Sequence, residues 1–187
     1  MCVTAAVEPV AEPAPPGRPW VRGALAVVVV VFAVFWVWAL FFASKEAVNR
    51  IDDRAWAARA ETICLDATEQ RIELTDLTRI DQADSTLIVR RATIVDESTD
   101  ILEQMLDDIV AVVPDDEKGQ AIVPLWEADY RVYVGDRRTY AAQLRESGEN
   151  LPFYETAEGG IPITERIATF AGDNDMPACS PPIDLTR

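Results

Sequence analysis

One stretch of the chain, GALAVVVVVFAVFWVWALFF at Gly23 to Phe42, restricts the possible folds more than any other. Its twenty residues include no charged side chain, and a helix rising about 1.5 Å per residue would carry them across a hydrocarbon core of about 30 Å. A buried helix of a soluble protein is a poorer interpretation, because such a helix usually shows a polar face. The run predicts a transmembrane helix over residues 23–43 that anchors the chain in the lipid bilayer.

A cleaved signal peptide is the competing interpretation of the same stretch. The apolar region of a signal peptide spans roughly 7–15 residues and ends in small residues at the cleavage site. Here the apolar run is longer, and Phe41 and Phe42 directly precede Ala43. An uncleaved signal anchor therefore fits the sequence better.

The charges beside the apolar run do not settle its orientation. Arg18 and Arg22 precede the run, whereas Lys45, Arg50 and Arg54 follow it. Counting positive charges thus slightly favours a cytoplasmic C-terminal part, but long domains are translocated largely regardless of charge.

The segment before the apolar run is short and rich in proline. Residues 1–22 include EPVAEPAPPGRP, cannot build a hydrophobic core, and are expected to form a disordered cytoplasmic tail. Two widely spaced cysteines in residues 44–187 favour an oxidising compartment for that part. We therefore predict a single-pass protein of the cell membrane, with a cytoplasmic N-terminus and an extracytoplasmic C-terminal domain.

The charge of the chain lies almost entirely in the predicted domain. The sequence has 32 acidic and 17 basic side chains, a formal net charge of −15, and residues 1–43 contain two of each. Residues 44–187 therefore carry the whole excess of negative charge. Such a surface repels a phosphate backbone, so no nucleic acid is expected as a partner.

Three long segments after the apolar run have the residue spacing of amphipathic helices, and none alternates like a half-buried strand. The first segment is expected to continue the membrane helix or to restart with Ser44 as its cap. Its predicted apolar face consists of Val48, Ile51, Ala55, Ala58, Thr62 and Leu65.

The second and third segments are separated by the turn PDDEKGQ. Pro114 ends the second helix, and the acidic residues that follow suit the positive end of the next helix dipole. Pro124 should lie in the first turn of the third helix or kink it. The apolar seam of the second helix consists of Ile88, Ala92, Val95, Thr99, Leu102, Leu106, Ile109 and Val113. The stripe of the third helix consists of Ile122, Trp126, Tyr133, Tyr140 and Leu144.

Helix breakers mark the part of the chain after residue 150. Pro152, Gly159, Gly160 and Pro162 precede a short amphipathic piece, ITERIATFAG, and an extended tail. The sequence as a whole predicts an all-α fold. A single N-terminal transmembrane helix is followed by an antiparallel three-helix bundle with a short fourth helix and an extended C-terminal tail.

The two cysteines of the predicted domain, Cys64 and Cys179, suggest a disulfide. Cys64 lies on the first helix and Cys179 lies between prolines in the tail, so a bridge would tie the tail to that helix. Closing so long a loop would stabilise the domain by about 4–5 kcal/mol in the chain-entropy model. Two unrelated buried thiols are the alternative, and a catalytic cysteine is disfavoured because the chain has no histidine to activate it. Cys2 in the N-terminal tail is expected to be a free thiol, and lipidation of this cysteine is the weaker alternative.

The sequence contains no catalytic or cofactor-binding motif that we can identify. A Gly-rich phosphate loop, G-x-S-x-G, H-E-x-x-H and C-x-x-C are all missing, as is histidine. DQAD at 81–84 and DND at 173–175 match calcium loops only in part, since neither has the full ligand spacing. We therefore predict no catalytic site, no cofactor and no metal site.

The densest group of aromatic and arginine side chains lies in residues 126–145. Because Trp, Tyr and Arg dominate the hot spots of interfaces, Trp126, Tyr130, Arg137 and Arg138 form a candidate interaction surface. The same helical spacing also suits a buried aromatic face, with the two arginines paired to nearby acids.

These features favour a non-enzymatic structural or interaction protein whose helical domain docks on another protein of the cell envelope. A membrane-anchored sensor or ligand-binding module is the alternative, and it would require a pocket between the helices. A carboxylate-based envelope enzyme has the least support, since acid pairs arise by chance in so acidic a domain.

Overall fold

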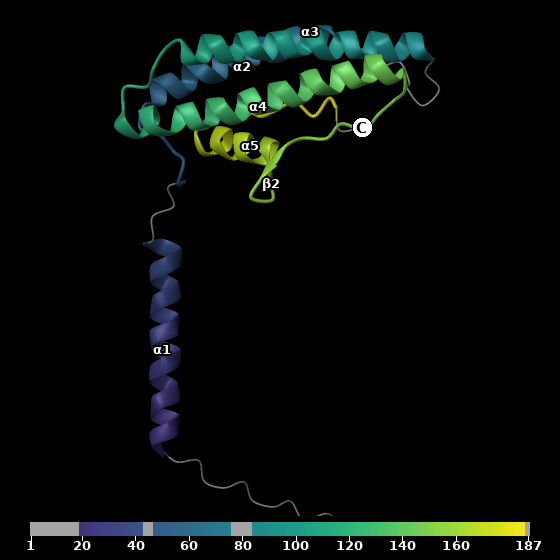
Figure 1. Cartoon of the computed structure of the whole chain (residues 1–187). Helices are drawn as coiled ribbons and strands as arrows, with labels where there is room; N and C mark the ends of the chain where they lie inside the picture. The colour runs from purple at the N-terminus through teal and green to yellow at the C-terminus, as the bar shows by residue number, and fades with distance from the viewer. Residues whose placement is uncertain (1–18, 43–46, 76–83, 186–187) are drawn as a thin grey trace, which may run out of the picture. The chain divides into compact units, whose positions relative to one another are not determined.

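The computed structural model describes residues 19–42, 47–75 and 84–185. The chain divides into two compact units, residues 1–45 and residues 46–187. Figure 1 shows the helices of both units. Each unit is considered by itself below.

Helix α1 (Pro19–Phe41) is the described part of the first unit. It begins four residues before the predicted start at Gly23, because Pro19 suits the first helical position, where no amide hydrogen is needed. None of its residues is buried, and it is long and apolar enough to cross a membrane, a test that a signal sequence near the N-terminus also passes. The predicted disordered tail and Cys2 lie outside the described residues, apart from positions 19–22, which are helical.

The second unit is a helical domain, which confirms the predicted all-α fold. Helices α2, α3 and α4 form the bundle, and α5 packs on α4 (Figure 1). The elements in chain order are α2 (Arg54–Glu73), α3 (Ser85–Val110), α4 (Glu117–Ser147), β1 (Ala157–Glu158), β2 (Ile161–Pro162), α5 (Ile163–Asp173) and the 3-10 helix η1 (Pro177–Cys179). The strands form a two-residue antiparallel hairpin, and η1 interrupts the tail that we predicted to be extended throughout.

The start of α2 differs from the prediction. The helix begins at Arg54, ten residues after Ser44, which lies outside the described residues. The Asp53 carboxylate accepts a hydrogen bond from the Trp56 amide and so caps the helix. A local capping interaction therefore sets the start of this helix.

The predicted apolar face of α2 was also wrong. Of its residues only Ile51 is buried, whereas Val48, Ala55, Ala58, Thr62 and Leu65 are exposed. The face that is buried consists of Trp56, Ala57, Ala60, Cys64 and Ala67. Small alanines on this face let α3 and η1 pack closely against α2, while the Trp56 indole donates to the Val112 carbonyl at 2.7 Å.

Helices α3 and α4 confirm their predicted seams. The seam of α3 is buried from Ile88 to Ile109, and only Val113, beyond the helix end, is exposed. In the stripe of α4 every predicted residue is buried except Ile122, which is partly buried. Pro124 lies inside α4 beyond its first turn, on the exposed side.

Ion pairs between α3 and α4 show the antiparallel register directly. Three arginines of α4, seven residues apart, meet acids of α3 in reverse order. The pairs are Arg131 with Asp107, Arg138 with Asp96, Asp100 and Glu103, and Arg145 with Asp96. The partner number falls along α3 as the arginine number rises along α4, as antiparallel helices require.

The tail after α5 runs back over the start of the domain. Asn174 is buried, and its side chain accepts from the Ile51 amide and donates to the Asn49 and Phe170 carbonyls, each at 2.9 Å. Arg54 donates to the Asn174 carbonyl at 2.8 Å. The first residues of the tail thus hold the segment that leads into α2.

Candidate functional site

Three of the four residues of the candidate interaction surface are buried. Trp126, Tyr130 and Arg137 are each 2% exposed or less, so they cannot form an outer docking face. The Trp126 ring stacks on Phe170 of α5 with ring centroids 5.4 Å apart and meets the Tyr130 ring edge-on at the same distance. Helix α5 covers this face of α4, and the aromatic stripe is core, as the competing interpretation held.

Arg138 lies at the surface and is held by acids. Its guanidinium pairs with Asp96 and Glu103 at 3.3 and 2.5 Å, and also with Asp100. Its side chain is 33% exposed. These contacts occupy Arg138 in an α3–α4 ion-pair ladder, in agreement with the expected pairing of this arginine with nearby acids.

Arg137 has a different environment, although it is the next residue. Its side chain is fully buried between α3, α4 and the tail, and each of its five N–H groups has a partner. On the helix side, Nε donates to Thr99 Oγ1 at 2.9 Å, Nη2 to Ser98 Oγ at 3.0 Å, and Nη1 to the Tyr133 hydroxyl at 3.1 Å. The other two bonds run from Nη1 and Nη2 to the two carboxylate oxygens of Asp184, at 2.8 and 2.9 Å.

The two partners shift each other's protonation equilibria. Burial opposes the charged form of Asp184, but the hydrogen bonds and charge of Arg137 outweigh it, so the pKa of Asp184 lies below its ordinary value. The positive charge of Arg71 acts in the same direction. Burial also raises the pKa of the Tyr133 hydroxyl, which donates to the Pro182 carbonyl at 3.1 Å. The pair is therefore charged at neutral pH.

This group of residues could not be found from the sequence. The sequence favours Arg137 as part of an interaction surface or as a partner of nearby acids, and Asp184 lies in a tail with no helical periodicity. The polar interruptions Ser98 and Thr99 in the buried seam of α3 were the available signal, because buried hydroxyls need a hydrogen-bond partner.

The cysteines predicted to pair lie at disulfide distance. The sulfurs of Cys64 and Cys179 are 2.02 Å apart and their Cα atoms 5.1 Å apart, and both side chains are buried. One residue before Cys179, the Ala178 amide donates to the Glu61 carboxylate at 3.0 Å. The tail is thus joined to α2 at its 3-10 helix and to α3 and α4 further along.

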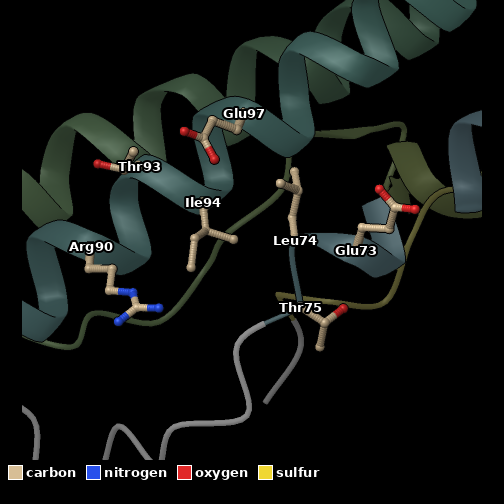
Figure 2. A pocket seen from close by; sticks show the side chains of 7 residues that line it. All are labelled: Glu73, Leu74, Thr75, Arg90, Thr93, Ile94 and Glu97. Carbon is tan, nitrogen blue, oxygen red and sulfur yellow. The ribbon is translucent and has the colours of Figure 1, made fainter. Parts of the chain in front are cut away.

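An open groove lies where the C-terminal end of α2 meets α3. It has a volume of about 490 Å³, and Figure 2 shows Leu74 and Ile94 within it, with Glu73 and Glu97 at its sides. Thr75, also in its lining, is the last residue described before the gap at 76–83. The DQAD segment lies almost wholly in that gap, and within the described ranges no three acidic or cysteine side chains are grouped to hold a metal ion.

Comparisons with known proteins do not add to this picture. No protein family, no curated protein and no solved structure matches the chain.

Proposed function

We propose that this chain is a single-pass membrane protein whose disulfide-bonded helical domain lies outside the cytoplasm and binds another protein of the cell envelope. The observation that carries the proposal is α1, a 23-residue helix with no buried residue. An apolar surface of this extent is unfavourable in water and favourable in a bilayer. The arginines around residue 50 would by their charge favour a cytoplasmic domain. They do not exclude export, because long domains are translocated largely regardless of charge.

The cysteine pair supports the proposed compartment. Disulfides persist in oxidising environments and are rare in the cytosol. We therefore infer that the domain, and not the proline-rich tail, lies on the outer side.

The charge of the domain supports binding rather than catalysis as its role. All of the net charge of −15 lies after residue 43, and charge of one sign speeds and orients encounters with partners of the opposite sign. We expect the partner to present a basic face.

Cysteine labelling on intact cells tests the orientation. Tyr154 is 80% exposed, so a Tyr154→Cys variant places a free thiol on the surface of the domain. With Cys2 replaced by Ser, a membrane-impermeant maleimide should label this variant in intact cells. Cys2 in the parent chain is the matched control and should react only after the cells are permeabilised. The reverse pattern would show that the domain is cytoplasmic.

Two further measurements address the anchor and the partner. The mass of the mature chain decides whether the apolar run is retained, because a chain beginning near Lys45 would identify it as a cleaved signal. Crosslinking in intact membranes followed by purification should recover one stoichiometric envelope protein. Its recovery should fall as salt rises, because the Debye length shrinks from about 10 Å at 0.1 M to about 3 Å at 1 M.

A further inference from the structure

The guanidinium of Arg137 is oriented by the bundle alone. Thr99, Ser98 and Tyr133, which take three of its five N–H groups, all belong to α3 and α4. These bonds aim the other two N–H groups, one on each terminal nitrogen, at a single carboxylate. A planar fork with two parallel donors is the geometry that binds a carboxylate in bidentate fashion. The helices therefore present a preorganised carboxylate receptor.

The ligand in this receptor is the tail segment beyond the disulfide. Asp184 supplies the carboxylate and the Pro182 carbonyl accepts from the Tyr133 hydroxyl. Leu185 is 6% exposed, while Ile183, between these anchors, is 74% exposed. The segment is thus held at three points, and its last two described residues, Asp184 and Leu185, lie in a turn.

The pocket for Leu185 is also built by the bundle. Its walls come from the N-terminal half of α3 and the C-terminal part of α4, namely Ile88, Ala92, Val95, Tyr140, Ala141 and Leu144. These side chains form a cluster separate from the main core. Burying the Leu185 side chain there removes apolar surface from water and so favours binding of the segment.

We propose that Arg137, Tyr133, Ser98, Thr99 and the Leu185 pocket form a binding site for a peptide segment that carries an aspartate followed by a leucine. In the free protein the chain's own segment 180–185 occupies this site. Because Cys179 anchors the tail just before the segment, residues 180–185 can leave the site while the bridge stays closed. A partner peptide of the same chemistry would take their place. The inference concerns residues 46–187 and stands whether or not the proposed topology is correct.

The chain's own segment competes with any partner peptide for the site, and because it is tethered its local concentration is high. A segment tethered through a few residues competes at an effective concentration in the millimolar range. The intact chain should therefore bind such a peptide far more weakly than a chain whose own segment has been removed.

A truncation and a synthetic peptide test the proposal. The full chain ending after Ser180 keeps both bridge cysteines, and it is purified in mild detergent with its anchor. The probe is a fluorescent peptide of residues 180–187, SPPIDLTR. We expect saturable binding to the truncated chain, at least tenfold weaker for a peptide with Asp184→Asn or Leu185→Ala, and at least tenfold weaker to the intact chain.

Matched variants separate the site from general charge. In the truncated chain, Ser98→Ala or Thr99→Val should weaken peptide binding several-fold, because the guanidinium loses a group that orients it. Arg138→Gln, which removes a neighbouring surface arginine, should leave the affinity unchanged. A folded truncated chain that does not bind the peptide, or binds the Asp184→Asn peptide equally well, would overturn the proposal.

A second measurement covers the case in which the truncated chain does not fold. Hydrogen exchange of the full-length Asp184→Asn chain should show loss of protection in residues 180–185, with α3 and α4 still protected. If α3 and α4 lose protection together with the segment, the segment is an integral part of the core and not a ligand.

Discussion

Arg137 illustrates how one buried charge is accommodated in this domain. Removing a guanidinium from water is costly unless each donor finds a partner, and here each of the five N–H groups has one. Four polar or charged residues are buried within the described ranges. Arg137 carries a charge, whereas Ser98, Thr99 and Asn174 are neutral. Its neighbour Arg138 pairs with more acids but stays partly in water.

These two arginines should respond differently to the same substitution. Arg137→Gln leaves Asp184 without its counter-charge and the buried hydroxyls short of donors, so the free energy of unfolding should fall by about 3–5 kcal/mol. Arg138→Gln removes surface pairs and should cost about 1 kcal/mol or less. Thermal or urea unfolding of the full chain in detergent, followed by circular dichroism, measures both. Equal losses of unfolding free energy would mean that burial does not determine how much these ion pairs contribute to stability.

The pKa shift of Asp184 predicts how acid affects the tail. Since the folded-state pKa lies below the ordinary carboxyl value of about 3.9, the contribution of Asp184 to stability is present above that value. It is lost as the pH falls through the lowered folded-state pKa. The titratable groups that interact with this carboxylate include Arg137, Arg71, Tyr133 and Tyr130.

A pH series on two chains measures this effect. The parent should melt at a higher temperature than the Asp184→Asn variant at neutral pH, because only the parent has the charged pair. The difference should narrow below about pH 4. A difference that stays constant into strong acid would contradict the assigned direction of the shift.

At the scale of the elements, α2 and α4 begin side by side and cap each other. The Asp53 carboxylate accepts from the Trp56 amide of its own helix and from the Asp115 amide, at 2.8 and 3.1 Å. The Asp116 carboxylate accepts from the Gly119 amide at 2.7 Å and from the Asp53 amide at 3.1 Å. Each aspartate thus satisfies donors at both helix starts, and the two helices are joined there by polar contacts.

Because the Asp116 cap lies directly against Gly119, a side chain at this position should disturb the capping contacts. A Cβ at Gly119 would lie 2.6 Å from Asp116 Oδ1 and 2.7 Å from the Pro114 Cβ. Gly119→Ala should therefore destabilise the domain, although alanine is the better helix former. Gly135→Ala, in the same helix with nothing within 4 Å, is the control and should stabilise it by up to about 1 kcal/mol. Stabilisation by both substitutions would show that the cap tolerates a methyl group.

At the scale of the whole domain, the tail joins elements that are distant in sequence. Asn174 holds the segment before α2, Cys179 reaches α2, and Asp184 reaches α4. The cysteines are 115 residues apart, so the loop that they close contains most of the domain. The bridge therefore lowers the conformational entropy of the unfolded chain, which none of the polar contacts does.

Removal of the bridge should lower the stability of the domain strongly. Cys179→Ser should cost about 4–5 kcal/mol in the chain-entropy model, and reductant should lower the melting temperature of the parent but not of the variant. Mass spectrometry of unreduced protein checks the bond itself. Free thiols at both positions in material from an oxidising compartment would contradict the bridge and weaken the proposed export.

Features that depend on local spacing could be predicted from the sequence alone. The apolar run determined α1, and the four-and-three spacing determined α3 and its seam, because length and periodicity act within one helix. The breakers around residues 152–162 likewise preceded α5, whose Ile163, Ile167 and Phe170 are buried as the spacing indicates. The all-α architecture follows from these local signals.

Only the tertiary structure decided which of several compatible faces is buried. Helix α2 has an apolar face at Ala55, Ala58 and Leu65 and another at Trp56, Ala60 and Cys64, and the packing of α3 and η1 selects the second. Likewise, Arg137 and Arg138 look alike in the sequence until a carboxylate 47 residues away reaches one of them. Contacts between distant residues have no periodicity, because they depend on where whole elements pack.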